Sequence, residues 1–202
     1  MIVVGALALQ GDFREHLHMV SKLGVEAVEV RTPQELASVD CLIIPGGEST
    51  AIGKLASRYG MIEPLQRRIR AGMPVLGTCA GMIFLGTATT GKPQPQLGVL
   101  DVTVERNAFG RQRDSFEAML DVKGLDEPMA AVFIRAPWIH EIGDDVDVLA
   151  TVFHAGSGRE YPVFVRRANV MAISFHPELT NDVRVHEMLL ALVDERPIGE
   201  DV

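Results

Sequence analysis

The strongest constraint on the fold is an alternation, in the first half of the chain, of short apolar runs with segments of helical periodicity. Four such runs lie at residues 2–9, 25–30, 41–44 and 74–77. The first run is nearly all apolar, as are parallel strands that are covered on both faces. After the first run, the apolar residues Phe13, Leu17 and Val20 recur at helical spacing. Strand, helix and strand joined by short links predict a parallel sheet with helices on both faces, an α/β fold.

The second half of the chain has a different pattern. A loop rich in glycine, proline and glutamine leads into strand-like runs joined by turns, at residues 99–105, 116–122, 131–134, 146–153 and 161–166. One more apolar run and a helical segment follow, at residues 170–175 and 181–194. We expect a doubly wound, mostly parallel sheet with an antiparallel β elaboration. The length suits a single domain of residues 1–196, followed by a short C-terminal tail of residues 197–202.

Several helix starts can be predicted from capping residues. Thr32 and Glu35 have the spacing of a capping box, with a proline between them at the first helical position. Asp12 is expected to cap the first helix, and Ser49 or Thr50 the helix that follows the third apolar run.

The composition excludes several classes of function. The 202 residues carry 19 Lys and Arg against 27 Asp and Glu, a formal charge of −8, which argues against nucleic-acid binding. Two cysteines, Cys41 and Cys79, are too few for a disulfide framework. No apolar run approaches the ~20 residues that span a bilayer, and the apolar N-terminus lacks the basic region of a signal peptide. We expect a cytoplasmic protein with reduced thiols and no membrane partner.

The motif Gly77-Thr78-Cys79-Ala80-Gly81 lies between an apolar strand and a helix. This is the setting of a nucleophile elbow, here with cysteine in place of serine. The flanking glycines allow the tight turn, and the nearby helix N-terminus favours the thiolate. The alternative is a buried structural cysteine at a strand–helix turn.

A second motif, His176-Pro177-Glu178, follows the last apolar strand. Proline is expected to hold the segment extended, so that His176 and Glu178 project to the same side. The carboxylate can then orient the imidazole toward Cys79, because the carboxyl ends of parallel strands meet at one rim of the sheet. The alternative is a solvated turn.

The third motif, residues 45–50, reads Pro-Gly-Gly-Glu-Ser-Thr and also follows a core strand. Its paired glycines expose backbone N–H groups, and that of Gly47 is a candidate oxyanion donor beside that of Ala80. A plain loop leading into a capped helix is the alternative.

These motifs together resemble those of the triad-type (class I) glutamine amidotransferases. The likeness extends to the glutaminase subunits of pyridoxal 5′-phosphate synthases. It rests on further blocks at residues 8–11, 14–16, 105–107, 109–112, 114–117 and 133–137.

The resemblance implies that Cys79 attacks the side-chain amide of L-glutamine, with His176 as general base and acid and Glu178 orienting it. It places glutamine against a further set of residues, namely Gly47, Glu48, Ser49, Arg106, Ile134 and Arg135. A guanidinium fork suits the substrate's α-carboxylate, although Arg106 could also be a surface residue at a strand end. The ammonia passes to a synthase subunit in a hetero-oligomeric complex that activates the glutaminase. No cofactor or metal is expected, since pyridoxal phosphate is the product of the complex.

Two other functions remain open at this point. One is a related Cys-His hydrolase, such as a γ-glutamyl peptidase that acts without a partner. The other is an amidotransferase-like scaffold with a dead site, against which the intact motifs count.

The other polar residues of interest receive structural or surface interpretations. Arg14 and His16 are expected on an exposed helix face that could contact the partner, and His186 is expected to face solvent. Gln10 ends the first strand at the reactive rim, where it could shape the oxyanion site or stabilise the loop.

Overall fold

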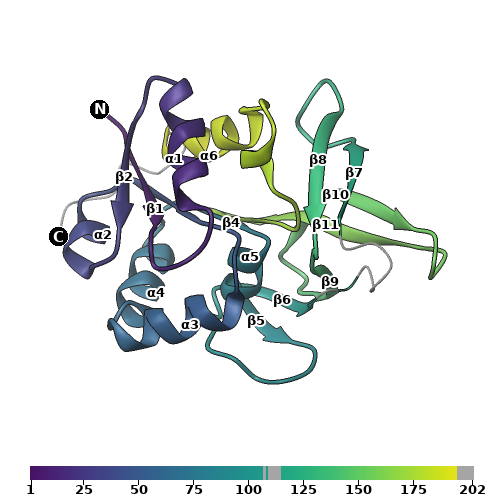
Figure 1. The fold of residues 1–202 in the computed structure, drawn as a ribbon, viewed down its shortest axis with the longest axis horizontal. Helices are drawn as coiled ribbons and strands as arrows, with labels where there is room; N and C mark the ends of the chain where they lie inside the picture. Colours follow the sequence, from purple (N-terminus) through teal and green to yellow (C-terminus); the bar gives the residue numbers. More distant parts are fainter. Residues whose placement is uncertain (107, 109–114, 195–202) are drawn as a thin grey trace.

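The computed structural model describes residues 1–106, 108 and 115–194 (Figure 1). The predicted boundary between domain and tail, at residues 196 and 197, lies outside the described part. Five parallel strands form the centre of the fold, in the order β12-β4-β3-β1-β2. They are β1 (Val3–Leu7), β2 (Glu26–Val30), β3 (Cys41–Ile44), β4 (Val75–Thr78) and β12 (Val170–Ile173).

An antiparallel extension continues this sheet beyond β12. Strand β11 (Arg159–Arg167) pairs antiparallel with β12, and β10 (Asp147–His154) pairs antiparallel with β11. A separate three-stranded sheet contains β5 (Gly86–Thr89), β6 (Leu100–Glu105) and β9 (Trp138–Ile142). Strands β7 (Ser115–Leu120) and β8 (Met129–Ile134) form a two-stranded sheet of their own. The predicted α/β class with an antiparallel elaboration is confirmed.

Helices cover both faces of the central sheet (Figure 1). On one face lie α1 (Phe13–Lys22) and α6 (Arg184–Asp194), and on the other α3 (Ser49–Arg58), α4 (Ile62–Arg70) and α5 (Ala80–Leu85). Each face has its own buried apolar cluster, and burial of such side chains is the main force that holds helices on a sheet. None of the helices in the described ranges is both long and apolar enough to cross a lipid bilayer.

The helix starts show which local predictions hold. Helix α2 (Pro33–Ala37) begins with the predicted capping box, because Thr32 accepts from the Glu35 N–H and Glu35 accepts from the Thr32 N–H. The predictions for the other two caps are wrong. Asp12 lies at the N-cap of α1 but makes no side-chain capping bond. Helix α3 is capped by Glu48, whose carboxylate accepts from two backbone N–H groups of the first turn.

Two strands of the described fold were not expected from the pattern. Strand β5 begins at Gly86 and has only four residues, and β9 has half-exposed or exposed residues over its last three positions. Both are identified by their pairing with β6, which supplies hydrogen bonds that a local pattern does not reveal.

Candidate active site

Cys79 occupies a strained turn between β4 and α5. Its φ of +49° lies in the left-handed region, which residues other than glycine rarely adopt. The flanking glycines are needed for close contacts on either side. A Cβ on Gly77 would lie 2.7 Å from the carbonyl carbon of Gly81, and a Cβ on Gly81 would overlap the carbonyl oxygen of Ile44. This geometry matches the predicted elbow and holds the thiol at the carboxyl edge of the sheet.

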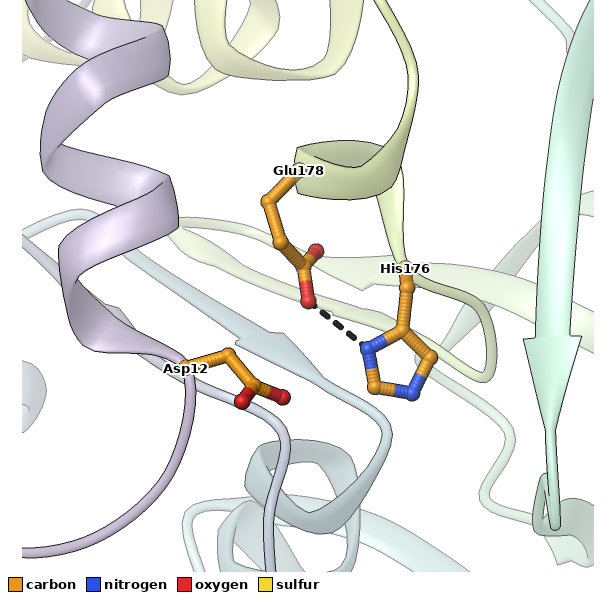
Figure 2. Close-up of side chains that lie close together, drawn as sticks. All are labelled: Asp12, His176 and Glu178. Atoms are coloured by element: carbon orange, nitrogen blue, oxygen red, sulfur yellow. Dashed lines mark hydrogen bonds and ion pairs between the residues drawn. The ribbon is translucent and has the colours of Figure 1, made fainter.

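His176 and Glu178 follow β12 at the same edge. The Nδ1 of His176 lies 2.7 Å from Oε1 of Glu178, and both side chains are buried (Figure 2). The predicted extended segment is wrong, because residues Pro177–Leu179 form a single 3₁₀ turn, η1, with proline at its first position. The turn still brings the carboxylate back to the imidazole.

The imidazole of His176 has a neighbour on each side, because Cys79 as well as Glu178 acts on its pKa. Burial alone would lower the pKa of His176, but the contacts with Cys79 and Glu178 outweigh burial and raise it from 6.5 to about 10. At neutral pH this imidazole is therefore a cation between two acidic groups.

A cavity of about 400 Å³ opens in front of the thiol. It is lined by Gln10, Asp12, Gly47, Glu48, Ser49, Cys79, Ala80, Ile83, Arg106, Ile134, Arg135, Pro137 and His176. The structure thus brings all the predicted site residues to one cavity except Glu178, which lies behind His176. The volume falls in the usual range for sites that bind small molecules. Asp12, Ile83 and Pro137 were not expected at the site, although the position of Asp12 just after the first strand gave a signal for it.

Glu48 and Arg106 form an ion pair at the cavity wall, with Nη2 3.2 Å from Oε1. Desolvation opposes ionisation of Glu48, but the N–H groups of Thr50 and Ala51 prevail and lower its pKa. Arg106 also donates to Gln94 Oε1 at 3.1 Å, an oxygen that accepts from the Ser49 hydroxyl as well. Gln94 was missed because it lies in a loop rich in proline and glycine, with no pattern to single it out.

Gln10 holds the loop that contains Gly46 and Gly47 in place. Its Oε1 accepts from the Glu48 N–H at 2.7 Å, and a Cβ on Gly47 would lie 2.5 Å from that same oxygen. A Cβ on Gly46 would lie 2.5 Å from Cε1 of His176. Both glycines are therefore required by close approach. Ala80 is the first residue of α5, so its N–H has no partner within that helix.

Another wall of the cavity is formed by Ile134 and Arg135, at the end of β8. The Cys79 sulfur lies 4.0 Å from the carbonyl oxygen of Ile134, and Arg135 has a φ of +43°. This strained backbone turns the chain from β8 toward β9 beside the thiol.

The chain as a whole is similar to known proteins. The model of the SNO glutamine amidotransferase family matches residues 6–195. The chain belongs to the SNO glutamine amidotransferase family.

Members of the family with curated names are similar over nearly their whole length. A protein of Acidothermus cellulolyticus, named pyridoxal 5′-phosphate synthase subunit PdxT, is 55% identical over 94% of this chain and 93% of its own. A Fervidobacterium nodosum protein of the same name is 48% identical, over 96% of this chain and 98% of its own. A crystal structure described as a glutamine amidotransferase superposes with a TM-score of 0.88 at 51% identity, covering 95% of this chain and 98% of that one.

Some blocks of the family resemblance cannot be placed. Asn107 and residues 109–114 lie outside the described residues. Arg106, just before them, lines the cavity as expected.

One cluster, which includes His176 and Glu178, has the residue types of a metal site. Ligand atoms of Asp12, His176 and Glu178 lie within 4.8 Å of one another (Figure 2). However, the Nδ1 of His176 is bonded to Glu178, and the raised pKa of His176 keeps the ring protonated. A protonated imidazole cannot ligate a metal. The cluster is better explained as two carboxylates near an imidazolium.

Two histidines were placed wrongly by the sequence analysis. His16 is fully buried rather than on an exposed contact face, and His186 is 1% exposed rather than solvent-facing. The Nδ1 of His16 lies 3.1 Å from the Nε2 of His186, and its Nε2 lies 3.3 Å from Glu178 Oε2. Glu178 therefore contacts a second layer of buried polar groups.

Burial of His186 predicts a loss of stability in acid. Burial lowers the pKa of His186 to about 4, against 6.5 when unfolded, so below pH 6.5 the unfolded chain binds the additional proton. The contribution of His186 to the free energy of unfolding is therefore fully present above pH 6.5 and is lost as pH falls toward 4. The loss between pH 7 and pH 5.5 is about 1 kcal/mol. Urea unfolding at the two pH values measures the loss.

His186→Leu should have a flatter pH dependence by that amount, because the titrating group is gone. His18→Leu, at an exposed position on α1, serves as the control and should keep the wild-type slope. Equal slopes for wild type and His186→Leu would contradict the assignment.

Proposed function

We propose that this chain hydrolyses L-glutamine to L-glutamate and ammonia, with Cys79 as nucleophile, His176 as general acid and base, and Glu178 as the group that orients the imidazole. One observation carries the proposal. A cysteine on a strained, glycine-flanked turn lines the same cavity as an imidazole whose Nδ1 lies 2.7 Å from a buried carboxylate. Nucleophile, base and orienting group in this relation are the general arrangement for acyl transfer.

The chemistry runs in two stages. The Cys79 thiolate attacks the side-chain amide carbon, and the imidazolium of His176 gives its proton to the leaving nitrogen as the C–N bond breaks. Ammonia leaves, and a γ-glutamyl thioester remains on the sulfur. The now neutral imidazole takes a proton from water, which attacks the thioester carbon and releases glutamate. This regenerates the thiolate and the imidazolium.

The tetrahedral intermediates carry negative charge on the former carbonyl oxygen. We assign its stabilisation to the N–H groups of Ala80 and Gly47, two residues that line the cavity. Ala80 is suited to this role because its N–H points out of the N-terminus of a helix.

The charged end of glutamine requires groups of both signs. The Glu48–Arg106 pair offers a carboxylate for the α-ammonium group and a guanidinium for the α-carboxylate. Ser49, Ile134 and Arg135 line the same cavity and complete the proposed substrate site.

The ammonia has a specific destination in this proposal. The curated relatives are named as subunits of pyridoxal 5′-phosphate synthase. We assign this chain the glutaminase role in such a hetero-oligomeric complex, with the partner synthase subunit as the recipient of ammonia. Pyridoxal 5′-phosphate is then the product of the complex. The cytoplasmic location stays a prediction from the sequence.

Labelling with a glutamine-analogue electrophile tests the site directly. Diazo-oxo-norleucine, added in the presence of the synthase subunit, should alkylate Cys79 stoichiometrically, because the analogue places a reactive carbon where the amide carbon would lie. Peptide mass spectrometry locates the label. Excess glutamine should protect Cys79, and ammonia release should fall in step with labelling.

The buried Cys41 provides an internal control, since it lies inside β3 and should remain unlabelled. Absence of label on Cys79 in the complex, or labelling that glutamine does not slow, would overturn the proposal. Strong ammonia release that is independent of the synthase subunit would instead favour a hydrolase that acts without a partner.

A further inference from the structure

Three elements bring buried polar side chains together behind Glu178. His16 comes from α1, His186 from α6 and Thr78 from the end of β4, and all three are buried. The Nε2 of His16 lies 3.3 Å from Glu178 Oε2 and 3.2 Å from the Thr78 hydroxyl. Its Nδ1 lies 3.1 Å from the Nε2 of His186. None of these three residues lines the cavity.

The carboxylate of Glu178 needs a second donor. Its Oε1 accepts from His176, but its Oε2 is buried, and no described residue makes a hydrogen bond of good geometry to it. A buried carboxylate oxygen without a donor is costly. The ring nitrogen of His16 that faces Oε2 is the group in position to serve it.

The protonation of the two histidines follows from their burial and contacts. Burial, reinforced by the neighbouring imidazoles of His186 and His176, holds the pKa of His16 well below 6.5, and burial lowers the pKa of His186 to about 4. Both rings are therefore neutral near pH 7, and each has one N–H donor and one bare nitrogen.

Only one assignment of the ring protons avoids placing a lone pair against the carboxylate. If Nε2 of His16 carries the proton, its N–H faces both the Thr78 hydroxyl at 3.2 Å and Glu178 Oε2 at 3.3 Å, and Nδ1 accepts from the Nε2–H of His186. The Nδ1 of His186 is then a bare acceptor, and it is the ring atom for which the described residues provide no partner. The opposite assignment would leave a buried N–H donor unsatisfied at that position, which is the less common case.

We propose that His16, backed by His186, is a positioning residue for the glutaminase reaction. It donates to Glu178 Oε2 and so keeps this carboxylate aligned on His176 and the imidazole aligned on Cys79. This inference rests on the proposed function, since it assigns a role within the same triad. Donors then converge on Glu178 from both sides, with His186 donating to His16, His16 serving Oε2, and the Nδ1–H of His176 donating to Oε1.

The test is the rate at which iodoacetamide alkylates the Cys79 thiol. The rate is measured on the full chain, without glutamine, over a series of pH values. His16→Leu removes the donor but keeps an apolar side chain of useful size. It should slow alkylation of Cys79 near pH 7 by about tenfold, because a hydrogen bond to a charged group is worth about that factor. The pH at which the alkylation rate reaches half of its maximum should also move upward. With glutamine and the synthase subunit, kcat should fall while KM stays the same.

Rescue separates hydrogen bonding from packing. His16→Gln puts an amide N–H close to the position of Nε2 and should restore most of the reactivity. The shorter His16→Asn cannot reach Glu178 and should behave like His16→Leu, and this pair keeps the test decisive if the leucine variant folds poorly. His18→Leu, exposed on the same helix, should match wild type.

Two outcomes would overturn the inference. One is wild-type reactivity and pH midpoint in His16→Leu and His16→Asn. The other is equal loss in His16→Gln and His16→Asn, which would make His16 a packing residue only. Alkylation requires neither glutamine nor partner, so failure of the proposed function would appear separately, as absence of ammonia release from the wild-type complex.

Discussion

Replacing Cys79 by alanine should abolish glutamate release from the complex with the synthase subunit, by at least about 10⁴-fold, because removal of a triad nucleophile leaves only the surrounding binding groups. The fold should survive. Alanine fills less space than cysteine, and the left-handed backbone at this position, with φ +49°, is no more strained for alanine than for the native residue. Glutamate formation and thermal unfolding measure the two effects.

Two further variants sharpen this expectation. Cys79→Ser keeps the size and shape of the nucleophile but should also be inactive, since a hydroxyl beside the same imidazole ionises far less readily than a thiol. Cys41→Ala changes the other cysteine, which is buried in β3, and should cost some stability while leaving kcat unchanged. Substantial activity in Cys79→Ala would exclude the thioester mechanism.

The sequence predicts the parts of the molecule that local chemistry or sheet topology decides. The capping box at Thr32 and Glu35 needs only residues three apart, and it forms as expected. The approach of Cys79 to His176 follows from a topological rule, because β4 and β12 are adjacent parallel strands and both residues follow their carboxyl ends.

Long-range contacts explain where the sequence analysis failed. Glu48 caps α3, although serine or threonine would be preferred, and its carboxylate also pairs with Arg106, 58 residues away. His16 is buried because it shares the inner face of α1 with Met19 and Val20, at spacings of three and four. The sequence contains this spacing. However, a polar residue on an apolar helix face is recognised as buried only when its partners, here His186 and Glu178, are known.

Gly81→Ala should be strongly destabilising at the active site. Helix propensity alone would favour it, since alanine is about 1 kcal/mol better than glycine inside a helix and Gly81 has no positive φ. However, the added Cβ would overlap the carbonyl oxygen of Ile44 at the end of β3. Backbone cannot rotate away as a side chain can, so we expect a net loss of about 3 kcal/mol, the upper end of the usual cost of overpacking.

Activity should fall further than stability alone explains. To relieve the clash, α5 must move away from β3, and Cys79 at the start of α5 moves with it. A displacement of about 1 Å at a reacting atom can cost about 10²-fold in rate.

Gly60→Ala is the matched control. It introduces the same methyl group at a left-handed position, φ +66°, with no atom within 4 Å, so it should cost only about 1 kcal/mol of backbone strain and no kcat. Urea unfolding and glutaminase rates distinguish the two variants, and equal behaviour would mean that α5 and β3 are less tightly packed than the absence of a side chain at Gly81 implies.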